Sequence, residues 1–441
     1  MRITAIAMCF SLLFSCAAYG APIAEVDKSP SLRLDLREVI ERALAASEEL
    51  KIKEREINKA EEMYRSVRSA ALPHVAAHSS RTYNIDYPAP MHLNEYEDEF
   101  GVSASQIVWS FGKVVHAISS ARKLVEANRF NREASRQEVI FAAKLGYYSA
   151  LLARNTLSIM KGSYANAVLN RKLLDQRSYG GRSPRYEIVR LDAEIASRMP
   201  RVNEAKAELD MAIETLRRLI GADPASKIEL KGGFLKAYPN LDYDRLVAMV
   251  YENEPSLKAL SKTVESAEAK VKSSVAGFFP TISAFSSLNY SRGSMMQTFF
   301  GRSGKFDRYV SAGINVSIPI WEGGQKEAEL GQARADKEIA LLNKEKVEKE
   351  ILLELKKAYL EYQQYKNNLK SDNEAVRLAE ESFKQMQEMF ASGQATLADL
   401  NDAERLLTSQ RLNKEMTLFN INVALAKIER LIAGEYNEGR F

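Results

Sequence analysis

The alternation of apolar and polar side chains is clearest over residues 310–318, where every even position is apolar and every odd position is small or polar. A period of two predicts a strand with one apolar face and one polar face. Residues 281–290 follow the same pattern with Phe285 as an exception, and residues 74–87 follow it more weakly because Arg81 falls in line with Val75 and Tyr83. Residues 98–111 share with 74–88 a composition rich in Ser, Thr, Tyr and Val with little Leu. Loop signals separate the members of each pair, which predicts two hairpins. These hairpins are expected at about 74–111 and 281–320.

Helical spacing of apolar residues dominates the rest of the chain. Residues from about 36 to 71 predict one charged helix that Pro73 ends. The stretches 112–179 and 324–392 contain no proline, and each predicts a helix on the order of 100 Å long at about 1.5 Å per residue. An isolated helix of this polarity is only marginally stable, so these helices are expected to pack along one another.

A narrow apolar seam indicates how the second long helix packs. Ile351, Leu355, Tyr359 and Tyr362 recur at steps of three and four residues, as in coiled-coil contacts. Lysine and glutamate occupy the other faces of this helix. A dimeric rod would show the same seam, and only the strands favour a tube.

The same order of elements occurs twice. An offset of 212 residues relates Trp109 to Trp321 and Gly181 to Gly393, and each glycine breaks a long helix. The breaks predict helical hairpins, and the repetition predicts a duplicated scaffold. The returning helices are expected at about 184–219 and 396–432. The two repeats are expected at about 37–221 and 250–434, with a mixed segment at about 222–254 between them.

Composition excludes several classes of function. The chain has 441 residues, and 62 basic residues against 58 acidic ones leave a net charge of only +4. This balance does not support nucleic-acid binding, which needs a basic face. No nucleophile or metal-ligand cluster is apparent in the sequence, so we expect no enzyme activity, no cofactor and no metal.

The N-terminus has the pattern of a secretory signal. Arg2 precedes a charge-free apolar run and then small residues, which predicts a signal peptide over residues 1–20 and a mature chain over 21–441. Both cysteines, Cys9 and Cys16, lie inside this segment, so the mature chain would contain no thiol. Lipidation at Cys16 stays open as an alternative.

The two hairpins allow two interpretations. They could form a soluble sheet whose apolar face covers a core, but the neighbouring helices offer no broad apolar surface to pack on it. Strands of about a dozen residues with an apolar and a polar face also match a transmembrane barrel. Four strands cannot close a barrel, and an open sheet edge in lipid leaves backbone groups unpaired. In this interpretation several chains must combine their hairpins.

Four motifs in the expected order resemble those of the TolC family of outer-membrane efflux proteins, and the resemblance covers essentially the whole mature chain. Pro-Ile-Trp-Glu-Gly-Gly at 319–324 and Val-Trp-Ser-Phe-Gly-Lys at 108–113 resemble the family's turns from strand to helix. The stretches 390–400 and 179–187 resemble its hairpin tips. The turn residues to which the resemblance applies are Trp109, Gly112, Trp321, Gly323 and Gly324.

The resemblance implies a mainly α chain with a β-barrel part that acts as a homotrimer. Three chains would form a 12-stranded barrel in outer-membrane lipid, continued by a long α-helical barrel in the periplasm of a Gram-negative bacterium. The function it implies is an exit duct for a tripartite efflux pump or a type I secretion system. Its partners would be a periplasmic adaptor, or membrane fusion protein, and an inner-membrane RND or ABC transporter.

The resemblance also implies a gate. Acidic residues just inside the closed tip map to Asp399 and Asp402, with Glu187 at the matching position of the first repeat. Asp399 and Asp402 are three residues apart on a helix and therefore share a face. In a trimer they would form two rings of carboxylates that attract cations. The simpler alternative is a pair of solvated aspartates, which a helix N-terminus favours.

The lock of the tip departs from the family pattern. The family's tyrosine and arginine are replaced here by Phe390 and Ala395. Arg182, Arg185 and Arg190 are the candidates to replace them. An adaptor would dock on the hairpin tips, although their glycines also fit simple helix caps. The tip residues that the resemblance assigns to docking are Gly180, Gly181, Ser183, Gly393, Thr396 and Leu397.

Two other functions stay open at this point. A periplasmic adaptor also contains long helical hairpins, but it normally has one hairpin flanked by glycine-rich domains that are absent from this sequence. A coiled-coil scaffold without pore activity would contain the helices but would not need the strands.

Overall fold

The computed structural model describes the chain outside residues 1–30, 84–95, 180–184, 236, 294–304 and 435–441. The predicted signal peptide over 1–20 and the two cysteines lie outside the described residues. So do Gly180, Gly181 and Ser183 of the first hairpin tip, and Arg182 beside them.

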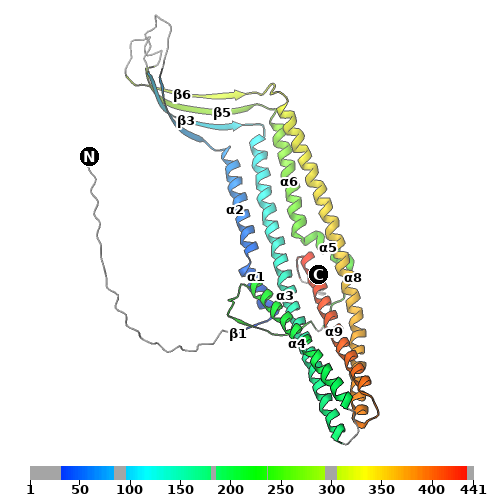
Figure 1. The fold of residues 1–441 in the computed structure, drawn as a ribbon. Helices are drawn as coiled ribbons and strands as arrows, with labels where there is room; N and C mark the ends of the chain where they lie inside the picture. The colour runs from blue at the N-terminus through cyan, green and yellow to red at the C-terminus, as the bar shows by residue number, and fades with distance from the viewer. Residues whose placement is uncertain (1–30, 84–95, 180–184, 236, 294–304, 435–441) are drawn as a thin grey trace, which may run out of the picture.

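The helical body is a long layer of parallel and antiparallel helices, with the sheet at its upper end in Figure 1 and the hairpin tips at its lower end. Two helices, α3 (Lys113–Tyr179) and α8 (Gln325–Ser392), run the full length of this layer. Shorter helices are stacked end to end beside them. The shorter helices are α2 (Glu48–Ser69) and α6 (Pro255–Ala276) in the upper half, and α4 (Arg185–Leu219) and α9 (Leu397–Leu431) in the lower half.

The junction between the two halves contains elements that the sequence pattern did not resolve. The single helix expected over about 36–71 is wrong, because the chain breaks at Ser47 between α1 (Leu36–Ala46) and α2. Ser47 ends α1 and caps α2, since its hydroxyl accepts a hydrogen bond from the Leu50 amide at 3.3 Å. A parallel pair of strands, β1 (Ser31–Leu34) and β4 (Lys227–Leu230), also lies here, followed by helix α5 (Tyr243–Asn253).

Three apolar clusters stabilise the body. One joins α1, α3 and α4 around Leu151, and a second joins α5, α8 and α9 around Leu355 and Tyr362. The third lies near the tips and joins α3, α4, α8 and α9 around Phe390. The seam expected from Ile351, Leu355 and Tyr362 is confirmed, because all three side chains are buried. Tyr359 is partly buried against the same cluster.

The upper end carries a four-stranded antiparallel sheet in the order β2-β3-β5-β6. The strands are β2 (His74–Tyr83), β3 (Tyr96–Trp109), β5 (Thr281–Arg292) and β6 (Asp307–Ser317). β2 pairs with β3 and β5 pairs with β6, both in antiparallel orientation. The sheet extends away from the helical layer, and no described helix covers either of its faces (Figure 1).

Cross-strand pairing shows which side chains share a face. Ala104 pairs with Val75, Val102 with Leu288, and Leu288 with Val310. A β-bulge between Ile107 and Trp109 shifts the register, so Trp109 pairs with Ile282 and keeps to the same face. The face that bears these residues is called here the apolar face. The opposite face, called the polar face, bears His78, Glu99, Ser287, Asn289 and Ser311.

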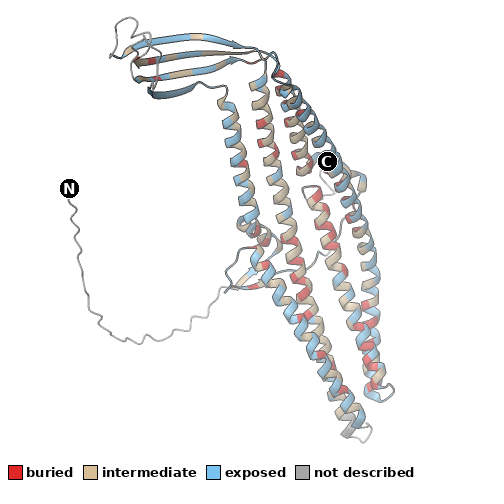
Figure 2. Cartoon of the chain, turned by 45° about the horizontal axis from the view of Figure 1, so that its top comes forward, coloured by how far each residue is buried: buried red, intermediate tan, exposed pale blue. Residues whose placement is uncertain are grey.

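Most residues of the sheet are exposed or half-buried in the single chain (Figure 2), and the apolar face includes some of the most exposed. Val75 is 68% exposed, Val310 66% and Ile314 72%. Phe285 is the exception on the polar face, as the sequence indicated. Its ring covers Gly313, where an added Cβ atom would lie 3.0 Å from the ring. No helix among the described residues is both long enough and apolar enough to cross a membrane.

Candidate functional site

The second hairpin tip is a tight turn from α8 to α9. Gly393 ends α8 with φ of 83°, a left-handed conformation that favours glycine, and its amide donates to the Met389 and Phe390 carbonyls. Thr396 then caps α9 in a reciprocal box with Asp399. The Asp399 amide donates to the Thr396 hydroxyl at 3.3 Å, and the Thr396 amide donates to the Asp399 carboxylate at 3.0 Å.

The two aspartates expected at the gate both lie on the exposed face of α9, but they differ in their partners. Hydrogen bonds from the Thr396 side chain and backbone lower the pKa of Asp399. Asp402 forms an ion pair with Arg405 one turn further along the same helix. A positive charge therefore lies beside Asp402, whereas the hydrogen bonds that Asp399 accepts from described residues come from neutral donors.

The other expected site residues are only partly brought together. Glu187 lies in the first turn of α4, half-buried, and makes no ion pair with any described residue. Gly393 and Thr396 are exposed at the second tip. Leu397 is only 3% exposed and belongs to the apolar cluster near the tips. Its side chain therefore contributes to the core and is not available to an adaptor in this conformation.

The two residues that stand where the family has its tyrosine and arginine contribute to the apolar cluster near the tips. Phe390 is 1% exposed, and Ala395 packs against the same cluster. Of the arginines considered as substitutes, Arg190 donates to the hydroxyl of Tyr186 on its own helix at 3.3 Å. Arg185 forms no ion pair with a described residue. Neither therefore joins the two hairpins.

A buried ion pair that the sequence analysis missed joins the hairpins instead. Arg198 of α4 and Glu404 of α9 are paired at 2.8 Å, with side chains 9% and 2% exposed. Arg198 also donates to the Ser163 carbonyl of α3 at 2.8 Å and to Glu194 at 3.0 Å. Asn401 of α9 in turn donates to Glu194. Three helices from both hairpins thus share one polar network.

A hollow of about 360 Å³ opens beside this network, and Arg198, Glu404 and Arg405 are among the residues that line it. The buried side-chain oxygen Oδ1 of Asn401 has no hydrogen-bond partner among the described residues. Water can therefore reach one side of the network, while its ion pair stays covered. The stability of such a buried ion pair depends on close contact, so a small separation of the helices would weaken it.

Both strand-to-helix turns contain two successive residues of positive φ. In the first turn these are Phe111 at 50° and Gly112 at 92°. In the second they are Gly323 at 65° and Gly324 at 87°. Trp109 packs edge-on to Phe111 at 6.0 Å between ring centroids and is 57% exposed. Trp321 is 83% exposed, so both tryptophans present their rings at the base of the sheet.

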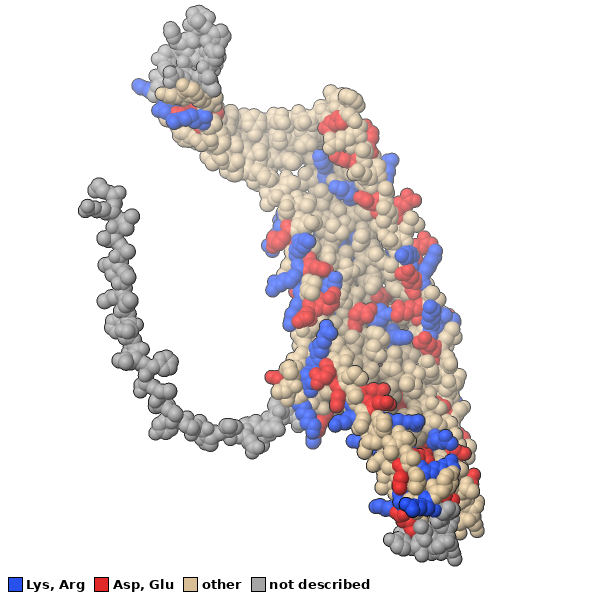
Figure 3. All heavy atoms as spheres, viewed as in Figure 1, with Lys and Arg blue, Asp and Glu red and all other residues tan. Residues whose placement is uncertain are grey.

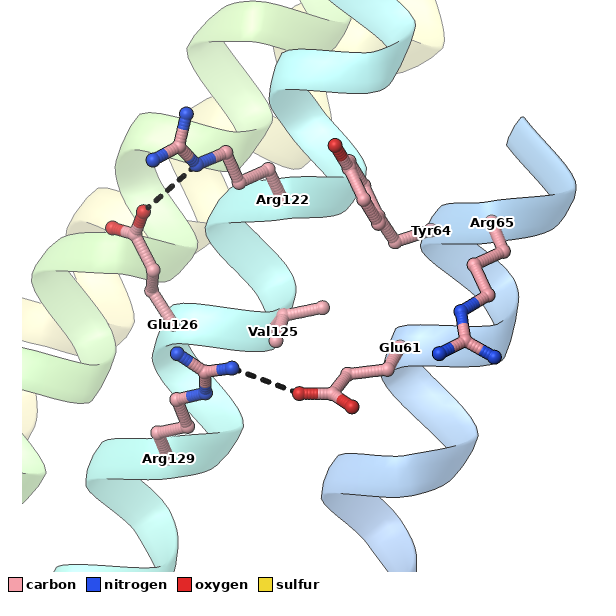
Figure 4. A pocket seen from close by; sticks show the side chains of 7 residues that line it. All are labelled: Glu61, Tyr64, Arg65, Arg122, Val125, Glu126 and Arg129. Atoms are coloured by element: carbon pink, nitrogen blue, oxygen red, sulfur yellow. Dashed lines mark hydrogen bonds and ion pairs between the residues drawn. The ribbon is translucent and has the colours of Figure 1, made fainter. Parts of the chain in front are cut away.

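Helix α2 at the edge of the body is held mostly by polar contacts. Figure 4 shows a hollow of about 310 Å³ between α2 and α3, crossed by the ion pair of Arg129 with Glu61 at 2.8 Å. A second pair, Arg132 with Glu54 at 2.7 Å, lies further along the same two helices. The only side chain that α2 buries is Ile57. The outer side of α2 therefore has no apolar partner within the described chain.

The part of the chain that is described contains no candidate metal centre. No group of three or more His, Cys, Asp or Glu side chains there could hold a metal ion. Near the second tip, Asp399 serves a helix cap, and Asp402 and Glu404 form ion pairs.

Comparison with known proteins identifies the family. A family model described as outer membrane efflux protein matches residues 39–222 and 246–434. The probable outer membrane lipoprotein SilC of Salmonella typhimurium is 21% identical over 374 residues, which cover 84% of this chain and 79% of SilC. The alkaline protease secretion protein AprF of Pseudomonas aeruginosa is 23% identical over 322 residues, 72% of this chain and 65% of AprF.

The fold is also shared with solved structures. The outer membrane protein VceC of Vibrio cholerae superposes with a TM-score of 0.79 over 91% of this chain and 97% of VceC, at 17% identity. The expected TolC-like fold is confirmed. Since the family model spans most of the residues, this chain belongs to the outer membrane efflux protein family.

Proposed function

We propose that three copies of this chain form one exit duct. Their sheets would close a 12-stranded barrel in the outer membrane, and their helices would form a tunnel through the periplasm. A periplasmic adaptor would dock on the hairpin tips and connect the duct to an inner-membrane transporter of the RND or ABC type. Cargo would pass through without chemical change, in drug or metal efflux or in type I secretion.

The open sheet is the observation that carries this proposal. Strands β2 and β6 form its edges, and each leaves a row of backbone donors and acceptors without a partner in the sheet. All ten residues of β2 are exposed. In lipid such edges must be paired, and a closed barrel is the arrangement that pairs them all. Pairing of β6 with β2 of the next copy would complete the ring.

The helices offer a second surface for the same assembly. Helix α8 exposes leucines and isoleucines at intervals that fall on one face of the helix, opposite its buried seam. These residues are Ile339, Leu342, Leu353, Leu360 and Leu378, each more than half exposed in the single chain. The edge helix α2 lies at the other side of the layer, where its outer side lacks a partner. A neighbouring copy would cover both.

The gate would lie where the hairpin tips of three copies meet. Asp399, Asp402 and Glu187 would face the constriction, with Asp399 as the stronger attraction for cations because Arg405 compensates Asp402. The docking surface would include Gly393 and Thr396 of the second tip, together with Gly180, Gly181 and Ser183 of the first. The buried pair of Arg198 and Glu404 would hold the two hairpins in the closed arrangement.

Cross-linking of the sheet edges tests the assembly. Ala77→Cys on β2 is combined in turn with Val310→Cys, Ala312→Cys and Ile314→Cys on β6, because the stagger between copies is not fixed by one chain. At least one pair should give a covalent trimer on oxidation, and the purified protein should form pores in a lipid bilayer. A chain that stays monomeric, forms no covalent trimer with any pair and conducts no ions would refute the proposal.

A further inference from the structure

A row of charged side chains crosses the apolar face of the sheet at the end furthest from the helices. Arg81 of β2 pairs in register with Asp98 of β3, and Asp98 pairs with Arg292 of β5. Arg308 of β6 lies opposite Tyr290, two residue pairs closer to the helices. All four share the face of Val102 and the other exposed apolar residues. Figure 3 shows basic side chains gathered at this end, while the middle of the sheet carries none in that view.

The row carries more positive than negative charge. Asp98 accepts hydrogen bonds from both Arg81, one of them at 3.1 Å, and Arg292. One carboxylate thus serves two guanidinium groups. Arg308 is exposed and forms no ion pair with a described residue. The Arg81 side chain remains 68% exposed despite its pairing, so its remaining donors can reach another acceptor.

Aromatic rings surround these arginines. Phe100 stacks on Tyr290 at 4.9 Å and meets Phe306 edge-on at 5.5 Å. The guanidinium of Arg292 lies 4.8 Å from the centre of the Phe306 ring. Aromatic girdles of this kind mark the boundary between the apolar band and the headgroups in membrane barrels. The two tryptophans at the base of the sheet lie at the opposite end of the apolar face.

Strand length places the row beyond the apolar band. Positions 98 to 109 of β3 are eleven steps apart in the sequence, which at about 3.3 Å per residue gives roughly 36 Å along the strand. A tilt of about 40° reduces this to roughly 28 Å across the membrane, slightly more than the apolar band of about 25 Å. The arginines therefore lie at headgroup level of the outer leaflet, whereas in hydrocarbon their charge would be strongly unfavourable.

We propose that Arg81, Arg292 and Arg308 bind the phosphate groups of a phosphorylated lipid of the outer leaflet. Arginine presents paired donors that match phosphate oxygens, and the neighbouring rings cover the upper part of the acyl chains. Asp98 orients two of the arginines and keeps their side chains extended across the strands. The inference rests on the proposed insertion of the sheet in the membrane. Three copies would carry three such sites around the barrel.

The test measures lipid retained by the full-length protein. Wild-type trimers in nanodiscs would contain bisphosphorylated lipid A, the same lipid after enzymatic removal of its phosphates, or phosphatidylcholine alone, and bound lipid would be quantified by mass spectrometry after gentle extraction. Arg308→Gln is the cleanest variant because it breaks no ion pair between described residues. Arg81→Gln is the second, and Arg37→Gln on α1 is the matched exposed control.

Each of the two sheet variants should lower retention of bisphosphorylated lipid A by about fivefold, as expected for one arginine near a charged membrane surface. Arg37→Gln should leave the retention of bisphosphorylated lipid A unchanged. Retention of the dephosphorylated lipid should not differ between the wild type and either sheet variant. Equal retention by wild type and the Arg81→Gln, Arg308→Gln double variant would overturn the inference, and so would complete displacement of the lipid by inorganic phosphate. Trimer formation and conductance are measured on the same samples, so loss of the lipid site is distinguishable from failure of the duct itself.

Discussion

Removal of one charge from the buried pair of Arg198 and Glu404 should favour the open tip. Glu404→Gln keeps the size of the side chain but leaves the Arg198 guanidinium, 9% exposed, without its carboxylate on α9. Removing one partner of a buried ion pair typically costs about 3–5 kcal/mol. In the open tip proposed above, the hairpins would separate and water would reach Arg198, so this cost would fall mainly on the closed state.

The magnitude follows from that difference. A closed state destabilised by about 3–5 kcal/mol shifts the ratio of open to closed channels by roughly two to three and a half orders of magnitude. Part of this effect will be lost, because Glu194 still accepts a hydrogen bond from Arg198 at 3.0 Å. The assay is single-channel conductance in planar bilayers, with uptake of a large antibiotic by cells as a second readout.

Matched variants separate gating from general damage. The double change Arg198→Met with Glu404→Leu replaces the pair with apolar groups, which is often neutral or stabilising, so it should restore closure. Arg377→Gln removes exposed ion pairs with Glu374 and Glu381 in α8 and should leave conductance unchanged. If Glu404→Gln channels form normal trimers and stay closed like the wild type, the assignment of this pair to the lock is wrong.

Three further changes test other parts of the structure. Asp399→Asn should reduce the block of the closed channel by divalent cations more than Asp402→Asn does, because Arg405 already compensates Asp402; equal effects in bilayer recordings would contradict the ring proposed at Asp399. Leu355→Ala should lower the free energy of unfolding by about 2–5 kcal/mol, since this side chain is fully buried, whereas Leu353→Ala on the exposed face of the same helix should cost far less in the single chain. Burial raises the pKa of the Glu254 carboxyl from its usual 4.5, so Glu254→Gln, which keeps an acceptor for the Ser256 amide, should raise the melting temperature at neutral pH. Burial disfavours the charged carboxylate of Glu254 in the folded state, so the gain in melting temperature should shrink as the pH falls towards 4.5 and the carboxyl becomes protonated. A gain that grows on acidification would refute the argument.

The long elements could be predicted from the sequence because each has an uninterrupted signal. Absence of proline over residues 113–179 and a seam at three- and four-residue steps leave few alternatives to a long helix. Alternation over residues 310–318 likewise determines which side chains of β6 share a face. The break at Ser47 was missed because serine fits a helix interior by pattern, and its capping role depends on the direction in which the chain leaves α1.

The ion pair of Arg198 with Glu404 could not be predicted from the sequence, because the two residues are far apart in the chain. A local signal does exist. Glu404 stands between Leu400 and Leu407 at positions where the apolar stripe of α9 continues, so a charged residue occupies a core position. Such a residue predicts a buried partner, although it does not identify it. The gate residues Asp399 and Asp402 came from family resemblance, and their roles stay predictions.

Continuity of α3 and α8 has a mechanical consequence. Only these two helices cross the junction between the upper and lower halves, while their neighbours end there. From Tyr147, in the apolar cluster at the junction, to the end of α3 at Tyr179 the helix forms a lever of thirty-two residues. At about 1.5 Å per residue the lever is roughly 48 Å long, and a rotation of about 10° would sweep its end by roughly 8 Å. A tilt of the helix at mid-height would thus be amplified at the proposed aperture, and substitutions far from the tip would change how wide it opens.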